Sequence, residues 1–220
     1  MAARPIFLHQ LPLGPMRNFV YLVGTEGERD VYVVDPAWDV DAIEKACTAD
    51  GKWLAGIFLT HSHKDHINGV AELLRRHDLP VYAQRAEIDF SPDLQAFGDA
   101  LRRLGPGDRV GMGGASVVAV HTPGHTPGSQ CLFAGDALVA GDTLFVNGCG
   151  RCDLLGGDPA AMFHTLTGVL GKLPPATRLF PGHDYGDVPV SSLGREAQRN
   201  PYFQFTDAKS FVTYRMRPRR

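Results

Sequence analysis

The sequence predicts an α/β protein in which two mixed β-sheets pack together with helices on the outside, an αβ/βα sandwich. Apolar β-strand patterns occur in two batches that are rich in hairpin signals, and helical patterns follow each batch. Several strands also end in His or Asp residues within Gly- or Pro-containing loops, and α/β sheets place their sites there. We expect residues 1–220 to form one domain, with residues 200–220 as a C-terminal tail packed on it.

The N-terminal half begins with strand patterns. We expect strands at 5–9, 18–23 and 30–34, and residues 24–28 form a hairpin turn between the last two. Residues 40–49 have a helical pattern with Asp39 as the N-cap. The apolar run 53–59 predicts a buried strand, 67–77 a helix with one apolar face, and 79–82 a short strand. We interpret residues 85–104 as a helical excursion.

The C-terminal half repeats this arrangement of elements. Strand patterns cover residues 108–111 and 116–121. Two further strands, 130–133 and 137–140, flank Gly135-Asp136, a hairpin signal. Residues 159–170 predict a helix, 178–180 a strand and 191–199 a last helix.

Composition limits the classes of protein and partner. Hydrophobic residues make up 44% and charged residues 21% of the chain, as in a soluble core. The net charge of -2 gives no reason to expect nucleic acid or an anionic membrane as a partner. No apolar run approaches the roughly 18 residues of a membrane helix, and we expect a cytoplasmic monomer or homodimer. We interpret four arginines at the end of the chain as solvated: Arg215, Arg217, Arg219 and Arg220.

One short stretch, from Thr60 to His66, carries four side chains that can bind a metal: His61, His63, Asp65 and His66. The whole chain has 9 histidines, so three within this stretch exceed what chance placement would give. His61 and His63 are two positions apart and can point to one side of an extended segment. Asp65 and His66 follow where the chain begins to turn, so they can face a second point.

Three later loops carry further ligand types. His125, Asp142 and His183 each follow a predicted strand in a loop held by Gly or Pro, which keeps ligand geometry fixed before a metal arrives. We expect His61, His63 and His125 to form a three-imidazole site that leaves zinc a position for water. Asp65, His66 and His183 would hold a second ion, and Asp142 is suited to bridge both.

This ligand set predicts hydrolytic chemistry. Two ions about 3.5–4 Å apart share one hydroxide at neutral pH, because both lower the pKa of water. The hydroxide would attack a carbonyl carbon while the ions take up the oxyanion charge. Asp65 is also expected to take part in catalysis beside this hydroxide. We find no Gly-x-Ser-x-Gly and no Cys–His pair that would supply a different nucleophile.

The motifs Thr-His-x-His-x-Asp-His, Pro-Gly-His, Gly-Asp-Thr-Leu-Phe and Pro-Gly-His-Asp-Tyr together resemble those of the metallo-β-lactamase superfamily, from residue 18 to residue 201. The closest resemblance is to the glyoxalase II and persulfide dioxygenase group, because residues 145–153 are similar to the segment after its bridging aspartate. In that group the basic residue at the Arg151 position helps hold glutathione, and a guanidinium suits its glycyl carboxylate. An ion pair of Arg151 with Asp153 or Asp158 is an equally good interpretation.

The resemblance implies a metal-dependent hydrolase of a thioester, of the hydroxyacylglutathione hydrolase type, with two divalent metals such as Zn, Fe or Mn. Glyoxalase II carries a longer C-terminal helical region than the segment after Asn200 here. Asp153 and residues 183–185 look more like persulfide dioxygenases, where residues matching His63, His125 and Asp142 hold one iron. A single-iron persulfide dioxygenase, a lactonase or β-lactamase, and a non-enzymatic metal-binding protein therefore stay open.

Some residues are expected to support this site. We place Asp35 and Asp153 behind the metal ligands, where Asp35 would orient a ligand histidine, although an Asp-Pro turn cap explains Asp35 nearly as well. Tyr185 follows His183 closely and is expected to line the substrate pocket, with core packing as the alternative.

Overall fold

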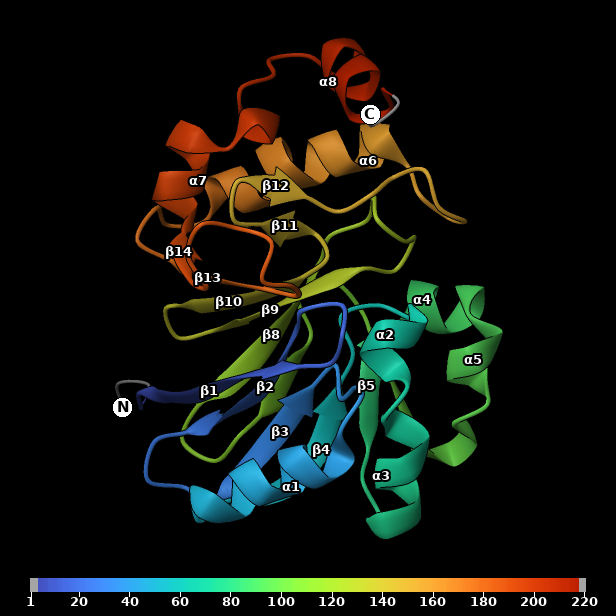
Figure 1. The fold of residues 1–220 in the computed structure, drawn as a ribbon, viewed down its shortest axis with the longest axis vertical. Helices are drawn as coiled ribbons and strands as arrows, with labels where there is room; N and C mark the ends of the chain where they lie inside the picture. The colour runs from blue at the N-terminus through green and yellow to red at the C-terminus, as the bar shows by residue number, and fades with distance from the viewer. Residues whose placement is uncertain (1–3, 218–220) are drawn as a thin grey trace.

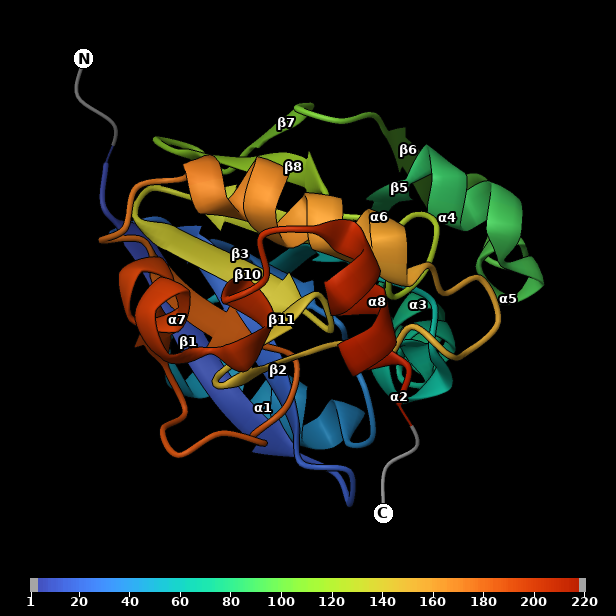
Figure 2. The ribbon, with the colours of Figure 1, turned by 90° about the horizontal axis from the view of Figure 1, so that it is seen from above.

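The computed structural model describes residues 4–217 and consists of two six-stranded sheets with helices outside them. In Figure 1 the two sheets occupy the middle of the molecule, with α1 and α3 below and α6, α7 and α8 above. Figure 2, seen from above, shows the C-terminal helices lying over the second sheet. The predicted sandwich of two mixed sheets is confirmed.

The first sheet has the strand order β1-β2-β3-β4-β5-β6. Its first three strands are antiparallel and its last three run parallel to β3, so the sheet is mixed. The strands are β1 (Ile6–Leu13), β2 (Asn18–Thr25), β3 (Asp30–Val34), β4 (Trp53–Phe58), β5 (Val81–Gln84) and β6 (Leu101–Leu104).

The second sheet has the order β14-β13-β10-β9-β8-β7 and is also mixed, because β10 and β13 are parallel while the other neighbours are antiparallel. The strands are β7 (Arg109–Gly111), β8 (Ser116–His121), β9 (Gln130–Ala134), β10 (Ala137–Gly141), β13 (Arg178–Pro181) and β14 (Ser191–Ser192). A small separate hairpin joins β11 (Leu144–Phe145) to β12 (Gly148–Cys149).

Helices cover the outer face of each sheet. On the first sheet lie α1 (Val40–Ala49), α2 (Lys64–Ile67), α3 (Val70–Arg76), α4 (Arg85–Phe90) and α5 (Pro92–Gln95). On the second lie α6 (Pro159–His164), α7 (Leu193–Arg199) and α8 (Ala208–Arg215), and helical turns at Thr165–Val169 and Leu170–Lys172 continue α6. The Asp39 side chain caps α1 by accepting a hydrogen bond from the Ala42 amide, as predicted.

Strand alternation divides the apolar side chains among three layers. On β2, Leu22 packs outward against the helices of the first sheet, while Tyr21 and Val23 pack inward. The inward layer joins residues of both sheets, such as Phe58 and Phe180. A third layer lies between the second sheet and its helices. These layers hold the two sheets in a fixed relation, which the site requires because both sheets contribute to it.

Three expected elements differ in the structure. The helical excursion over residues 85–104 ends in a strand, β6, which pairs with β5. The helix expected at 67–77 begins earlier and is divided into α2 and α3. The helix expected at 191–199 begins with the short strand β14. None of the helices found in residues 4–217 has the length and hydrophobicity that a membrane span requires.

The C-terminal segment contains the helix α8. Phe211 of α8 is fully buried and contacts the Phe163 ring of α6. The interpretation of Arg215 as solvated is wrong: its side chain is buried, and its Nε and Nη2 donate to the Gly150 carbonyl at 2.9 and 2.8 Å. Arg217 is exposed. Arg219 and Arg220 lie outside the described residues, as does that end of the expected tail.

Candidate metal centre

The predicted metal ligands follow the carboxyl ends of strands from both sheets. β4 of the first sheet leads into the stretch that carries His61, His63, Asp65 and His66. In the second sheet β8, β10 and β13 lead to the remaining ligands, which are His125, Asp142 and His183. The structure brings all of these side chains together where the two sheets meet.

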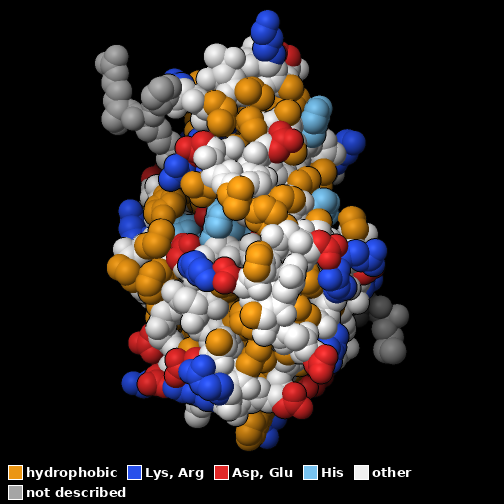
Figure 3. Space-filling view, turned by 90° about the vertical axis from the view of Figure 1, so that its right-hand side faces the viewer, with side chains coloured by type: hydrophobic (Ala, Val, Ile, Leu, Met, Phe, Trp, Pro, Cys, Tyr) orange, Lys and Arg blue, Asp and Glu red, His pale blue; other side chains and the backbone are white. Residues whose placement is uncertain are grey.

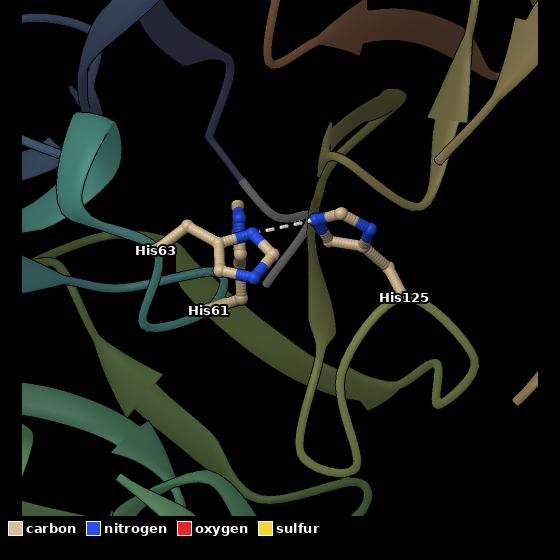
Figure 4. Close-up of side chains that lie close together, drawn as sticks. All are labelled: His61, His63 and His125. Carbon is tan, nitrogen blue, oxygen red and sulfur yellow. Dashed lines mark hydrogen bonds between the residues drawn. The ribbon is translucent and has the colours of Figure 1, made fainter. Parts of the chain in front are cut away.

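The first group is His61, His63 and His125, with one nitrogen from each ring within 4.8 Å of the others. His63 Nδ1 and His125 Nε2 lie 2.9 Å apart. Figure 4 shows the three rings facing one another, with His125 approaching from the side opposite His63. Three imidazoles that meet at one point form the donor set of a catalytic zinc site.

The second group is Asp65, His66 and His183. The Nε2 atoms of His66 and His183 lie 3.1 Å apart, and each is 3.4 Å from Asp65 Oδ2. Asp142 lies between the two groups. Its Oδ1 is 3.3 Å from His66 Nε2 and 3.4 Å from His183 Nε2, while its Oδ2 is 3.6 Å from His125 Nε2. One carboxylate oxygen therefore faces each group.

Hydrogen bonds behind the rings determine which nitrogens carry protons. Nδ1 of His125 donates to the Arg151 carbonyl at 2.7 Å, and Nδ1 of His183 donates to the Met16 carbonyl at 2.9 Å. Carbonyl oxygens only accept, so the proton of each neutral ring is on Nδ1. Nε2 of both histidines then has no proton, and its lone pair points into the centre. Each lone pair can therefore bind a cation in its own group, and a backbone acceptor on the other ring nitrogen is the arrangement expected of metal-binding histidines.

Two buried atoms in the centre have no hydrogen bond within residues 4–217: His61 Nε2 and Asp142 Oδ1. Buried polar atoms are normally satisfied, and an unpaired one costs about 1–3 kcal/mol. His61 belongs to the first group and Asp142 Oδ1 faces the second, and both atoms are of types that bind metals. The residues present therefore fit a pair of cations.

The electrostatics of the metal-free centre are consistent with this fit. Burial, together with the neighbouring His66, holds the pKa of His61 well below its usual value, and burial next to His125 lowers the pKa of His63 to about 4. Burial opposes the charge of His66, but Asp142 and Asp35 outweigh it and raise the pKa of His66 well above its usual value. Without a metal, a proton on His66 takes the place of a cation.

A family model of the metallo-β-lactamase superfamily matches residues 13–183, which include every predicted ligand. The chain belongs to the metallo-β-lactamase superfamily. The recognition made from the motifs is confirmed, and so is the fold that it implies.

Two curated relatives and one solved structure place the chain within this superfamily. The probable polyketide biosynthesis zinc-dependent hydrolase BaeB of Bacillus velezensis is 34% identical over 91% of this chain and 88% of its own. The hydroxyacylglutathione hydrolase of Alkalilimnicola ehrlichii is 39% identical over 76% of this chain but 62% of its own. The crystal structure of ETHE1 from Myxococcus xanthus has a TM-score of 0.85 and 30% identity, covering 97% of this chain and 92% of its own.

In this superfamily member, hydrogen bonds from other elements orient the ligands. Asp35 Oδ2 lies 3.0 Å from His66 Nδ1, and Asp35 also accepts hydrogen bonds from the amide and hydroxyl of Thr60 at 2.7 and 2.5 Å. Sequence reasoning missed Asn18, whose Nδ2 donates to Asp65 Oδ2 at 3.1 Å. Trp38 Nε1 donates to Asn18 Oδ1 at 2.8 Å, which fixes the orientation of the amide. Asn18 opens β2 and gave no chemical signal in the sequence.

A cleft of about 610 Å³ opens over the candidate metal centre. His63, Asp65, His125, Asp142 and His183 lie at its inner end. In Figure 3 histidine side chains are visible in a hollow, with hydrophobic side chains along its edges. A substrate can therefore reach the predicted ligands directly from solvent.

The predicted substrate residues line this cleft. The guanidinium of Arg151 forms a bidentate pair with Asp153, from Nε to Oδ1 at 3.0 Å and from Nη2 to Oδ2 at 2.9 Å. Asp153 therefore pairs with Arg151 instead of supporting a metal ligand from behind. The Tyr185 ring stacks on His183 with centroids 4.6 Å apart and an interplanar angle of 6°, and it is half exposed.

Proposed function

We propose that this protein is a metal-dependent hydrolase that cleaves a thioester, of the hydroxyacylglutathione hydrolase type. The observation that carries the proposal is the position of Asp142 between two ligand groups at the inner end of an open cleft. The relatives include a zinc-dependent hydrolase and hydroxyacylglutathione hydrolases, which support a metallo-hydrolase.

Residues of this chain would hold two divalent cations, preferably zinc. His61, His63 and His125 would hold one cation, and Asp65, His66 and His183 would hold the other. Asp142 would contact both. When bound, such cations lower the pKa of water and stabilise negative charge on a reacting carbonyl oxygen. Asp65 lies on the cleft wall with its Oδ2 held by Asn18. We propose that Asp65 accepts the proton that the attacking water releases.

The cleft walls would bind the rest of the thioester. Asp153 occupies Nε and Nη2 of Arg151, so the remaining N–H groups of the guanidinium can bind a carboxylate of the thiol part. Phe145 and Tyr185, whose rings are in edge contact with centroids 5.4 Å apart, offer apolar surface beside the predicted ligands.

The proposal is tested by turnover of S-lactoylglutathione and of simple acyl thioesters by zinc-loaded protein. We expect His63→Ala and Asp142→Ala to lower kcat/KM by about 100-fold or more, because each removes charge stabilisation at the reacting carbonyl. Absence of turnover with every thioester by the zinc-loaded wild-type protein would refute the proposal.

A second candidate is a single-iron persulfide dioxygenase. His63, His125 and Asp142 lie together, with His125 Nε2 2.9 Å from His63 Nδ1 and 3.6 Å from Asp142 Oδ2. Two histidines and one carboxylate form the donor set of many non-haem iron oxygenases. Oxygen uptake by iron-loaded protein with glutathione persulfide would support this candidate. If the protein hydrolyses thioesters and shows no such oxygen uptake, the dioxygenase candidate is rejected.

A further inference from the structure

Glu87 of α4 is a buried carboxylate that the proposed chemistry does not use. Its side chain is 1% exposed, and within residues 4–217 no ion pair neutralises it. Burying an ionised carboxylate is costly unless hydrogen-bond donors replace the lost water. The donors around Glu87 therefore indicate which parts of the chain the carboxylate holds together.

Four donors surround this carboxylate, two for each oxygen. Oε1 accepts from the Ser62 amide at 2.8 Å and from the Ser62 hydroxyl at 2.6 Å. Oε2 accepts from the Thr126 hydroxyl at 2.7 Å and from the Gly128 amide at 2.9 Å. The two backbone N–H groups can only donate, so Glu87 must be an acceptor at both oxygens.

Each oxygen binds a different ligand loop. Ser62 lies between His61 and His63, whereas Thr126 directly follows His125. These loops leave different sheets, after β4 and β8, and a backbone hydrogen bond from the Gln130 amide to the Thr60 carbonyl at 2.9 Å joins them only at their base. One carboxylate therefore connects the two chain segments that supply the three-imidazole group.

The close approach of the second loop to α4 depends on glycine. A Cβ atom at Gly128 would lie 2.0 Å from the Glu87 backbone nitrogen and 2.4 Å from its Cα. Gln130 adds a connection nearer the strands, because its Nε2 donates to the Leu59 carbonyl at 2.8 Å. The parts of both loops that bear the histidines extend beyond that connection and are joined through Glu87.

We infer that Glu87 is a positioning residue that sets the spacing of His61, His63 and His125 and thereby the affinity of this group for a metal. The inference rests on the proposed metal-dependent function. The second group depends on other contacts, because Asn18 orients Asp65 and Asp35 orients His66. Loss of Glu87 should therefore weaken one metal site and leave the other nearly unchanged.

The test is a zinc competition titration of Glu87→Gln with a chromophoric chelator, beside the visible spectrum of the cobalt-loaded protein. The Gln amide has one acceptor oxygen, and its NH₂ group faces donors on one of the loops. We expect one of the two stepwise zinc affinities to fall by about 10–100-fold and the cobalt spectrum to change. A purely structural role would lower thermal stability without changing the ratio of the two affinities.

Glu196→Gln is the matched control. Glu196 is also fully buried and accepts hydrogen bonds from Asn147, Ser191 and Asn200, none of which adjoins a predicted ligand. We expect the two zinc affinities of the Glu196→Gln variant to equal those of the wild type. A uniform fall of both affinities in Glu87→Gln, or a fall in Glu196→Gln of equal size, would overturn the inference.

If Glu87→Gln does not fold, Thr126→Val replaces it, because this change removes one donor and keeps the side-chain shape. A selective, several-fold weakening of one zinc site is then expected. If the wild type binds two zinc ions and the variants have the same zinc affinities and cobalt spectrum as the wild type, the inference about Glu87 is wrong but the proposed function stands. Wild type that binds no zinc overturns the proposed function as well.

Discussion

His66 affects both the metal-bound and the metal-free state of the proposed centre, because its ring lies between Asp35 and Asp142. With a metal bound, His66 would be a neutral ligand. Without one, burial opposes protonation but the two carboxylates outweigh it, so its pKa is raised. The same residue therefore links metal binding, protonation and the stability of the fold.

The first prediction concerns the pH dependence of the chelator-treated protein. The stability that His66 contributes is fully present below its unfolded pKa of about 6.5 and is lost as pH rises through the raised folded pKa. His61 and His63 have lowered pKa values and affect stability only below about pH 6.5. We therefore expect the Tm of metal-free protein to fall as the pH rises above about 6.5.

Calorimetry of wild type and His66→Asn provides the control. The substituted protein should lack the fall in Tm over this pH range, and zinc-loaded wild type should lack it too. A metal-free wild type whose Tm is constant or rises over the same range would contradict the assigned protonation of His66.

Gly150 shows that backbone packing also positions the ligands. A Cβ atom there would lie 1.8 Å from the Asp142 carbonyl oxygen and 3.1 Å from the His125 Cβ atom. We predict that Gly150→Ala lowers the free energy of unfolding by about 1–3 kcal/mol and reduces zinc content, because both neighbours must move. Gly168→Ala is the control, since nothing lies within 4 Å of its added Cβ. Zinc content unchanged in Gly150→Ala would disprove the close approach.

At the scale of elements, α8 supports the cleft from behind. Arg215 donates two hydrogen bonds to the Gly150 carbonyl, and the next carbonyl, that of Arg151, accepts from His125 Nδ1. The C-terminal helix is thus connected to a predicted ligand through one short segment of chain. A segment near the end of the described chain contributes in this way to the geometry of a site built mainly by the sheets.

The prediction for this element compares two arginines. Arg215→Met should lower the free energy of unfolding by about 1–3 kcal/mol, because the buried Gly150 carbonyl loses both guanidinium donors and keeps only the weak Cys152 thiol donor at 3.6 Å. Arg217→Met should change it by less than about 1 kcal/mol, because Arg217 is exposed and its guanidinium lies over the Tyr214 ring. Denaturant unfolding measures both, and equal effects would show that burial of Arg215 is unimportant.

At the scale of the whole molecule, the sequence predicts the sandwich and the clustering of the proposed ligands because both depend on local patterns. Apolar runs mark most strands, and the ligands occur in short motifs directly after them. β6 was not predicted because its residues Leu-Arg-Arg-Leu have two exposed arginines and also suit a helix. It is a strand because β5 is available for pairing, which is a tertiary effect.

The supporting contacts could not be predicted because they join distant parts of the chain. Glu87 binds residues 25 to 41 positions away, and Arg215 binds a carbonyl 65 positions away. Residue type alone suggests a solvated Arg215 at the chain end. Only the packing of α8 brings it to Gly150. The ligand motifs carry the chemistry, whereas the geometry that holds them is distributed over the whole fold.

The most direct test of the central claim is anomalous diffraction from crystals of zinc-loaded protein. We predict two peaks about 3.5–4 Å apart, with Asp142 between them, one peak beside His61, His63 and His125 and the other beside Asp65, His66 and His183. A single peak, or no peak among these side chains, would contradict the claim that two sheets converge to hold two cations.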